Sequence, residues 1–283
     1  MITIRWMMLA LLSPIFLVAQ NQKNFKIKEE RTGLSIAYVT CFNKTLGKGV
    51  YSSSEGELTM DVNLGDTLVF SCMAYEDDTL FVNNFEEKEV YLKTKSVILG
   101  EVSISSKNIE KKKKLKVGYK KKTSHRFGIG VYGTEVARYF NDSSIHGKVI
   151  QRLIVPVKTD KEAGVVRLHL YSVDSNGMPY EDLIPVNIVL TDSLVKRKAW
   201  VADLTEYNIV FPENGVFVST EYFFTVHQKV EEERKMYSYM YQSHEQENKA
   251  LVRNRTRQAM YNWSSDSYYV SFNMNFAFYI EVL

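Results

Sequence analysis

The sequence predicts an all-β protein made of two antiparallel sandwiches. Aromatic residues make up 13% of the chain, with 18 Tyr and 15 Phe, and such residues favour strands over helices. Short apolar runs alternate with turn residues, and no window keeps a helical apolar period. The 283 residues, 45% of them apolar, suffice for one large domain or two ordinary domains with cores of their own.

The first nineteen residues have the pattern of a secretion signal. A positive start, Met1–Arg5, precedes the apolar run Trp6–Val18, and Ala19 provides a small residue for cleavage. The apolar run is shorter than the ~20 residues that span a bilayer. We expect a signal peptide over residues 1–19 and export to the periplasm, the outer membrane or the medium, with no transmembrane segment after cleavage. A buried N-terminal strand or an uncleaved anchor is the alternative.

Residues 25–104 are predicted to form the first sandwich. Turn signals at Glu55-Gly56 and Leu64–Asp66 separate its β-rich runs. The predicted strands are Thr32–Phe42, Gly49–Tyr51, Glu57–Val62, Thr67–Ala74, Thr79–Val82 and Glu89–Leu92. Cys41 and Cys72 lie in two of these predicted strands, and we expect each to be a small buried side chain. A disulfide between them is the alternative, because export would permit one.

Residues 105–126 form a Lys-rich segment that makes an otherwise acidic chain basic. Lys107–Arg126 holds ten Lys or Arg and one acid, Glu110. Unpaired charges do not enter a core, so the segment is a linker or a solvated edge. We predict no nucleic-acid partner for this segment, because only Tyr119 could stack on a base and we expect the chain to be exported. Attraction to an anionic lipid or polysaccharide stays open.

Residues 127–283 are predicted to form a second, larger antiparallel sandwich of jelly-roll type. Its predicted strands are Phe127–Tyr132, Val149–Val157, Gly164–Val173, Pro185–Thr191, Ala199–Asp203, Asn208–Phe211 and Val216–Val226. The polar residues 228–258 are a loop, a short helix or an extended hairpin. Strict alternation of apolar residues from Tyr268 to Val282 predicts a long closing strand with one buried face.

The stretch Gly33–Val82 resembles the carboxypeptidase regulatory-like, or transthyretin-like, domain. The matching segments are Ala37–Val39, Ser54–Leu58 and Gly65–Ser71, and Ala74-Tyr75 stands where the family has Gly-Tyr. The second half is similar to the region that follows this domain in exported proteins of Gram-negative bacteria, at Gly133–Ala137, Arg167–Tyr171, Pro179–Leu183, Trp200–Leu204 and Val216–Glu221. The resemblance implies a transthyretin-like first sandwich, a place in the cell envelope and no assigned chemistry.

The sequence offers no catalytic signature, so we expect a protein that is not an enzyme and has no cofactor or metal. His244 and Glu247 have the spacing of a zinc carboxypeptidase pair, but no later His supplies the third ligand. Nucleophile-elbow and phosphate-loop motifs are absent from the sequence. A hydrolase whose carboxylates meet only in the fold is the alternative.

The predicted function is a non-catalytic envelope module that binds a protein or a glycan. Aromatic residues near the C-terminal end are the candidate ligand-binding residues: Trp263, Tyr261, Tyr237, Tyr239 and Tyr241. The three tyrosines alternate, so on a strand they would share one face. A packed hairpin face is the competing interpretation, and a structural accessory of an outer-membrane complex is a further functional alternative.

Overall fold

The computed structural model is all-β, which confirms the predicted fold class. It describes residues 22–84, 86, 88–95, 114–129, 132–159, 165–190, 198–223, 238–243, 250–258, 261–264 and 275–283, with the backbone alone at 122–125, 127–129, 159, 223 and 238–239. Within these residues the helices are single 3-10 turns, η1 (Ser143–Ile145) and η4 (Thr205–Tyr207). The expected signal peptide, residues 1–19, lies outside the described residues.

No helix in the described part of the chain combines the length and the apolar character needed to cross a membrane.

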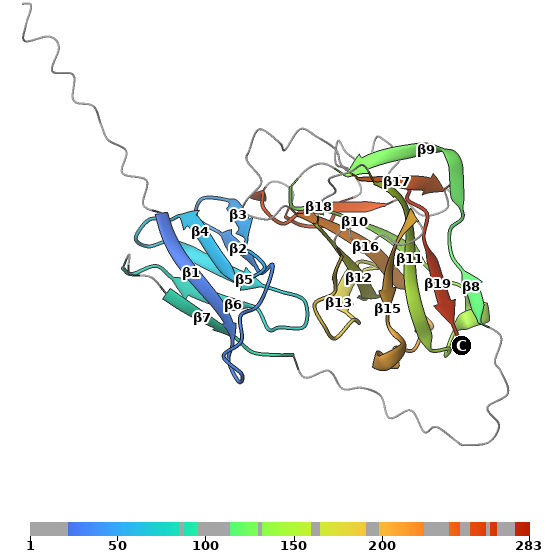
Figure 1. Ribbon diagram of the computed structural model, residues 1–283, viewed down its shortest axis with the longest axis horizontal. Helices are drawn as coiled ribbons and strands as arrows, with labels where there is room; N and C mark the ends of the chain where they lie inside the picture. Colours follow the sequence, from blue (N-terminus) through green and yellow to red (C-terminus); the bar gives the residue numbers. More distant parts are fainter. Residues whose placement is uncertain are drawn as a thin grey trace, which may run out of the picture.

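The N-terminal sandwich stacks a three-stranded sheet, β4-β1-β7, on a four-stranded sheet, β3-β2-β5-β6 (Figure 1). The pair β1–β7 is parallel, and the other pairs are antiparallel. The strands are β1 (Gln22–Glu29), β2 (Thr40–Asn43), β3 (Lys48–Tyr51), β4 (Glu57–Asp61), β5 (Thr67–Ser71), β6 (Asp78–Phe81) and β7 (Lys88–Leu92).

Period-two burial builds the core of this sandwich. In β4 the side chains of Leu58 and Met60 are buried while their neighbours are exposed, and in β1 Phe25 and Ile27 do the same. Gly56, before β4, is needed because its φ is +76° and a Cβ there would lie 2.8 Å from the carbonyl oxygen of Ile27. Cys41 and Cys72 are free, buried thiols of this sandwich.

The predicted strand Thr32–Phe42 is wrong over most of its length, because only residues from Thr40 onward form a strand. Gly33 closes a turn by donating its N–H to the carbonyl of Glu29. Tyr38 has a left-handed backbone conformation, with φ of 57°, which no strand can accommodate. The buried side chains of Ile36 and Val39 gave the segment its strand-like apolar pattern.

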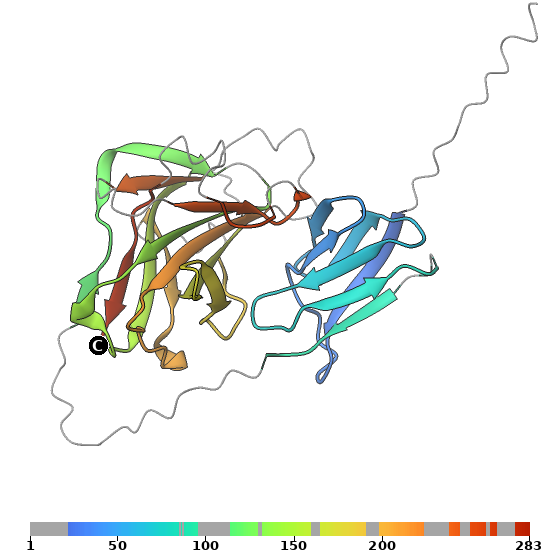
Figure 2. The ribbon, with the colours of Figure 1, turned by 180° about the vertical axis from the view of Figure 1, so that it is seen from behind.

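The second sandwich has two antiparallel sheets, β13-β12-β16-β10-β18 with β14 beside β12, and β8-β19-β11-β17-β9 with β15 beside β11. The first of these sheets lies nearer the N-terminal sandwich in both views (Figures 1 and 2). The strands are β8 (Leu115–Val117), β9 (Lys121–Ile129), β10 (Thr134–Phe140), β11 (Ile150–Thr159), β12 (Val165–Val173), β13 (Pro179–Asp182), β14 (Val189–Leu190), β15 (Ala199–Asp203), β16 (Val216–Phe223), β17 (Ser238–Ser243), β18 (Leu251–Asn254) and β19 (Tyr279–Val282).

Of the predicted closing strand, the structure describes residues 275–282, and only β19, Tyr279–Val282, is a strand there. Phe276, Phe278, Ile280 and Val282 are fully buried in the core between the two sheets. Residues 268–274 of the predicted strand lie outside the described residues. Because these alternate side chains face one core, the C-terminal segment holds β11 and β8 on either side of β19.

Other segments depart from their predictions in ways that their backbones explain. Asn208 is left-handed, so the segment 208–211 makes only an isolated bridge from Val210 to Val149. The described part of residues 228–258 is neither a helix nor a hairpin, since β17 and β18 belong to different sheets. In the Lys-rich segment, β8 and the start of β9 are edge strands of a sheet rather than linker.

Candidate functional site

The sheet β13-β12-β16-β10-β18 turns a charged face toward the N-terminal sandwich. In β12 the side chains of Val166, Leu168 and Leu170 enter the core, so Arg167 and His169 point the opposite way. The same alternation on the neighbouring strands adds further charged or polar side chains. We call the set the junction network: Glu135, Arg167, His169, Tyr171, Asp182, Glu221, Arg253 and Arg255.

Glu221 of β16 is fully buried, and donors from both sandwiches meet at its carboxylate. One oxygen, Oε2, accepts hydrogen bonds from Arg167 Nη1 at 2.8 Å and His169 Nε2 at 3.0 Å. The other, Oε1, accepts one from the hydroxyl of Tyr51 at 2.7 Å and lies 3.2 Å from Arg255 Nε. Both oxygens of this buried carboxylate are therefore engaged.

Glu135 of β10 is the second fully buried carboxylate of the network. Its Oε2 accepts hydrogen bonds from Arg253 Nε at 2.7 Å and Arg255 Nε at 3.0 Å. Its Oε1 accepts them from the hydroxyls of Tyr171 and Ser219, each at 2.8 Å. A carboxylate that gains this many donors is stabilised in its ionised form.

His169 lies between the carboxylates of Asp182 and Glu221. Its Nδ1 is 2.5 Å from Asp182 Oδ2, and its Nε2 is 3.0 Å from Glu221 Oε2. Both ring nitrogens thus face acceptors, and only the imidazolium can donate from both. The ring stacks on Tyr171 with 5.1 Å between the centroids, which fixes its plane. The network therefore uses His169 as a cation.

The pKa shifts follow from these contacts. Burial alone would raise the pKa of Glu135, but Arg253, Arg255 and His169 outweigh burial and hold it well below its ordinary value. The pKa of Glu221 is lowered in the same way, with Arg255 and Arg167 overcoming burial. Burial opposes the charge of His169, yet its carboxylate neighbours raise its pKa.

The network reaches across the boundary between the two sandwiches. Besides the bond from Tyr51 to Glu221, Arg167 donates from Nη2 to the carbonyl oxygen of Tyr38 at 2.7 Å. Asn187 donates to the carbonyl oxygen of Ala37 at 3.0 Å. Two backbone carbonyls of the segment 36–39 thus accept hydrogen bonds from side chains of the second sandwich.

A backbone seam runs beside the network. The N–H of Gly49, on β3, donates to the carbonyl of Thr256 at 2.9 Å, and the N–H of Gln258 donates to the carbonyl of Gly47 at 3.1 Å. The edge of the N-terminal sheet is in this way paired with the segment after β18. We call this contact the β3 seam. Together with the network, it joins the two sandwiches through hydrogen bonds as well as apolar contacts.

The network is poorly suited to metal binding or catalysis. Donor atoms of Glu135, His169 and Glu221 lie within 4.8 Å of one another, which is a spacing that a metal could use. However, guanidinium groups already occupy the carboxylate oxygens, and His169 would have to lose a proton that its neighbours stabilise. Three carboxylates here face three arginines and one imidazolium, so each carboxylate already has a cationic partner. We therefore assign the network a structural role.

The aromatic residues that the sequence predicted as ligand-binding residues lie in different parts of the structure. Trp263 is half-buried, edge-on to Tyr171, with the guanidinium of Arg253 4.3 Å from its ring centroid. Tyr261 packs on Phe42 with 4.5 Å between the ring centroids. Tyr261 therefore packs across the boundary between the two sandwiches, while Trp263 packs within the second one.

The three alternating tyrosines lie elsewhere in the second sandwich. Tyr241, on β17, has the ammonium of Lys121 5.4 Å from its ring centroid. Tyr239 is on the same strand with its backbone alone described, and Tyr237 lies outside the described residues. The described side chains of the nominated set therefore form no common exposed stripe.

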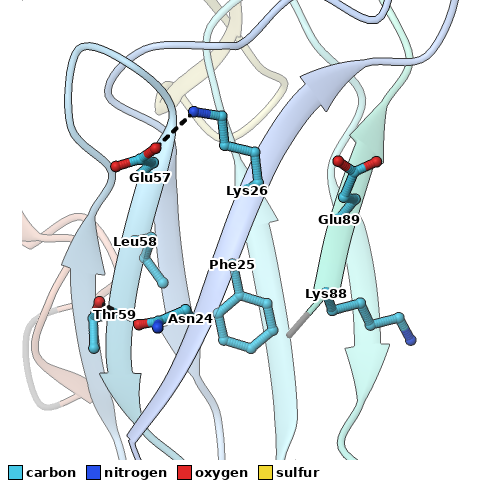
Figure 3. A pocket seen from close by; sticks show the side chains of 8 residues that line it. All are labelled: Asn24, Phe25, Lys26, Glu57, Leu58, Thr59, Lys88 and Glu89. Carbon is cyan, nitrogen blue, oxygen red and sulfur yellow. Dashed lines mark hydrogen bonds and ion pairs between the residues drawn. The ribbon is translucent and has the colours of Figure 1, made fainter. Parts of the chain in front are cut away.

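One groove of about 510 Å³ lies over the sheet β4-β1-β7, and four of its polar side chains pair with one another (Figure 3). Lys26 Nζ is 2.9 Å from Glu57 Oε1, and Thr59 donates to Asn24 at 2.7 Å. Glu89 accepts from Lys28. Because these groups satisfy each other, this groove has few of them left for a ligand.

A second groove, of about 590 Å³, lies where β8, β19 and the β10–η1 connection meet. We call it the basic groove. It is lined by the lysines Lys116 and Lys120, by Asn141, Asp142 and Ser143, and by the ring of Tyr279, among others. Neither lysine makes an ion pair with a carboxylate of the described residues. The sequence hinted at this groove only through its run of lysines.

No known protein family matches this sequence, and no curated protein matches it either. Among solved structures, a Bacteroides uniformis protein that is named as a candidate carbohydrate-binding protein aligns with 93% of this chain and 96% of its own. The identity is 9% and the TM-score is 0.22, so this similarity carries no argument about fold or function.

Proposed function

We propose that this chain is an exported, non-catalytic module of the cell envelope that binds a glycan in its basic groove. The observation that carries the proposal is the composition of that groove. It combines an aromatic ring, Tyr279, with hydroxyl, amide and ammonium groups on a folded sheet edge. Sugars are bound in proteins by this combination of an apolar surface and a few directed polar groups.

The groove has free hydrogen-bonding capacity. Among the described residues, no hydrogen bond is made by the side-chain hydroxyl of Ser143 or by the ammonium of Lys120. The other groove, over β4-β1-β7, has its charges and amides largely paired internally. The basic groove is for this reason the better candidate.

Support for export comes from the sequence alone, through the signal-like pattern of residues 1–19. Support for a non-catalytic role comes from the junction network. Its two fully buried carboxylates, Glu135 and Glu221, are already bound by three guanidinium groups. Neither groove is lined by Glu135 or Glu221. A glycoside hydrolase uses a pair of carboxyl groups beside the bond that it cleaves, and the lining of the basic groove contains a single one, that of Asp142.

A glycan array followed by titration calorimetry tests the proposal. We expect binding to at least one glycan, and at least a ten-fold loss of affinity, about 1.4 kcal/mol, in Tyr279→Ala. Tyr180→Ala is the matched control, because Tyr180 is 65% exposed on β13, away from the groove. Absence of binding to every glycan, or an equal loss of affinity in both variants, would refute the proposal that the basic groove binds a glycan.

Incubation of the bound glycan with the protein tests the non-catalytic part separately. We expect its chain length to stay unchanged by chromatography over a day. Release of new reducing ends that tracks the purified protein would show that the chain is a hydrolase.

A further inference from the structure

We propose that the basic groove selects acidic glycans, meaning polysaccharides that bear carboxylate, sulfate or phosphate groups, through Lys116 and Lys120. This inference rests on the proposed function and names its substrate class. The evidence is the charge of the groove, the placement of Lys116 and the contrast with lysines elsewhere in the molecule.

The lining of the groove contains more ammonium groups than carboxylates. Lys116 and Lys120 line it, and Lys114 and Lys121 flank them on the same short segment. The one acidic side chain in the lining is Asp142, whose Oδ1 accepts the N–H of Ser144 at 2.9 Å. An anion that enters the groove therefore meets a surplus of ammonium groups, which are strong donors to anionic oxygens.

These lysines differ from two lysines of the N-terminal sandwich. On β1, Lys26 and Lys28 are each paired with a glutamate of a neighbouring strand. Within the described residues, Lys116 and Lys120 have no such partner. Edge strands commonly have lysines that discourage pairing with other chains, but that role needs no groove beside them.

Lys116 is held at the aromatic surface of the groove. Its Nζ is 4.2 Å from the ring centroid of Tyr279, a cation–π contact. A neutral sugar that stacks on this ring face has to displace the ammonium. An acidic sugar beside the ring can instead pair with the ammonium where it lies. The contact therefore favours an anionic ligand over a neutral one of the same shape.

A concave site with an aromatic wall fits a polysaccharide better than a membrane surface. An anionic bilayer is flat and needs no pocket, and polybasic segments bind it through charge alone. Here Tyr279 and Phe140 contribute to the lining between the lysines and the β10–η1 connection. We therefore infer a glycan rather than a lipid headgroup as the source of the anion.

Homogalacturonan oligosaccharides, as the free acid and as the methyl ester, provide a matched pair of probes, because esterification removes the negative charge and adds one methyl group per sugar. Sulfated and desulfated chondroitin make a second pair that differs in charge density, since the desulfated chain keeps its carboxylates. We expect the full-length protein to bind the more highly charged member of at least one pair at least ten-fold more tightly at 50 mM NaCl. The preference should shrink at 500 mM NaCl, because salt screens exposed charges.

The double variant Lys116→Gln/Lys120→Gln should lose at least ten-fold in affinity for the acidic glycan. Lys88→Gln/Lys95→Gln removes the same charge from the N-terminal sandwich and should bind like the wild type. Equal or better binding of neutral glycans would overturn the proposed selectivity for acidic glycans and leave the proposed glycan binding intact. Binding to no glycan would overturn both the selectivity and the proposed function. Binding to phosphatidylglycerol vesicles, with no acidic glycan bound, would replace the glycan by a lipid surface.

Discussion

His169 is the residue of the junction network whose charge changes closest to neutral pH. Its pKa is raised by the carboxylates around it, against the opposing effect of burial. A group with a raised folded-state pKa stabilises the fold below its unfolded value, here 6.5, and loses that contribution as the pH rises through the folded value. For Glu135 and Glu221 the dependence of stability on pH has the opposite sign, because their pKa values are lowered from 4.5. Their contribution is present above pH 4.5 and is lost as the pH falls.

These signs predict a stability plateau between about pH 4.5 and 6.5, with a decline on each side. In His169→Gln the alkaline decline should largely disappear while the acid decline stays. Urea unfolding from pH 4 to 9 measures both. His146→Gln, at a histidine outside the network, should keep the wild-type profile. An alkaline decline that is unchanged in His169→Gln would contradict the assignment of a buried imidazolium.

Single residues show where prediction from sequence stops. The alternation Arg167-Leu168-His169-Leu170-Tyr171 is visible in the sequence and identifies a strand with one apolar face. The usual interpretation is that its polar face meets solvent. The partners that bury it lie on β10, β13, β16 and β18 and in the N-terminal sandwich, many positions away. Such pairings are set by the fold and cannot be found from spacing.

At the scale of the element, strands with strict alternation were predicted well and segments with irregular backbones were not. β4, β7, β15 and the end of β19 match their predictions, because their buried and exposed side chains alternate. β17 and β18 were missed because they lie in a polar stretch, and β18 is only four residues long. No local sequence pattern predicts the basic groove or the β3 seam, since each is formed by elements that are distant in the sequence.

Gly49 tests the β3 seam. A Cβ at this position would lie 2.8 Å from the carbonyl oxygen of Arg255 and 3.0 Å from the Cα of Thr256, both backbone atoms that cannot move cheaply. Gly49→Val should therefore separate β3 from its partner segment and destabilise the fold by roughly 1–3 kcal/mol, the usual range for overpacking. Limited proteolysis should cut near residue 256 more readily.

Lys48→Ala is the control on the same strand, because it changes an exposed side chain and leaves the backbone of the seam unaltered. It should leave both the unfolding free energy and the digestion pattern close to wild type. A Gly49→Val protein as stable and as resistant as the control would mean that the seam is loose and adds little to the association of the two sandwiches.

At the scale of the whole molecule, the network and the seam make one structural unit of two sandwiches that each have a core. Glu221 is fully buried, and its hydrogen bond from Tyr51 crosses the boundary to the N-terminal sandwich. Loss of one sandwich would expose a charged network in the other. Folding of the two sandwiches should therefore be coupled, although their strands do not intermix.

Calorimetry of the full chain tests this coupling, and we expect one unfolding transition. Tyr51→Phe removes the hydroxyl that donates to Glu221, a charge-assisted hydrogen bond of about 1.5–3 kcal/mol. Its melting midpoint should fall by roughly 3–10 °C for a chain of this size, and the transition should broaden or split. Tyr91→Phe, which removes an exposed hydroxyl bonded to Glu89, should melt like the wild type. Two separate transitions in the wild type would show that buried charge at the boundary does not couple the sandwiches.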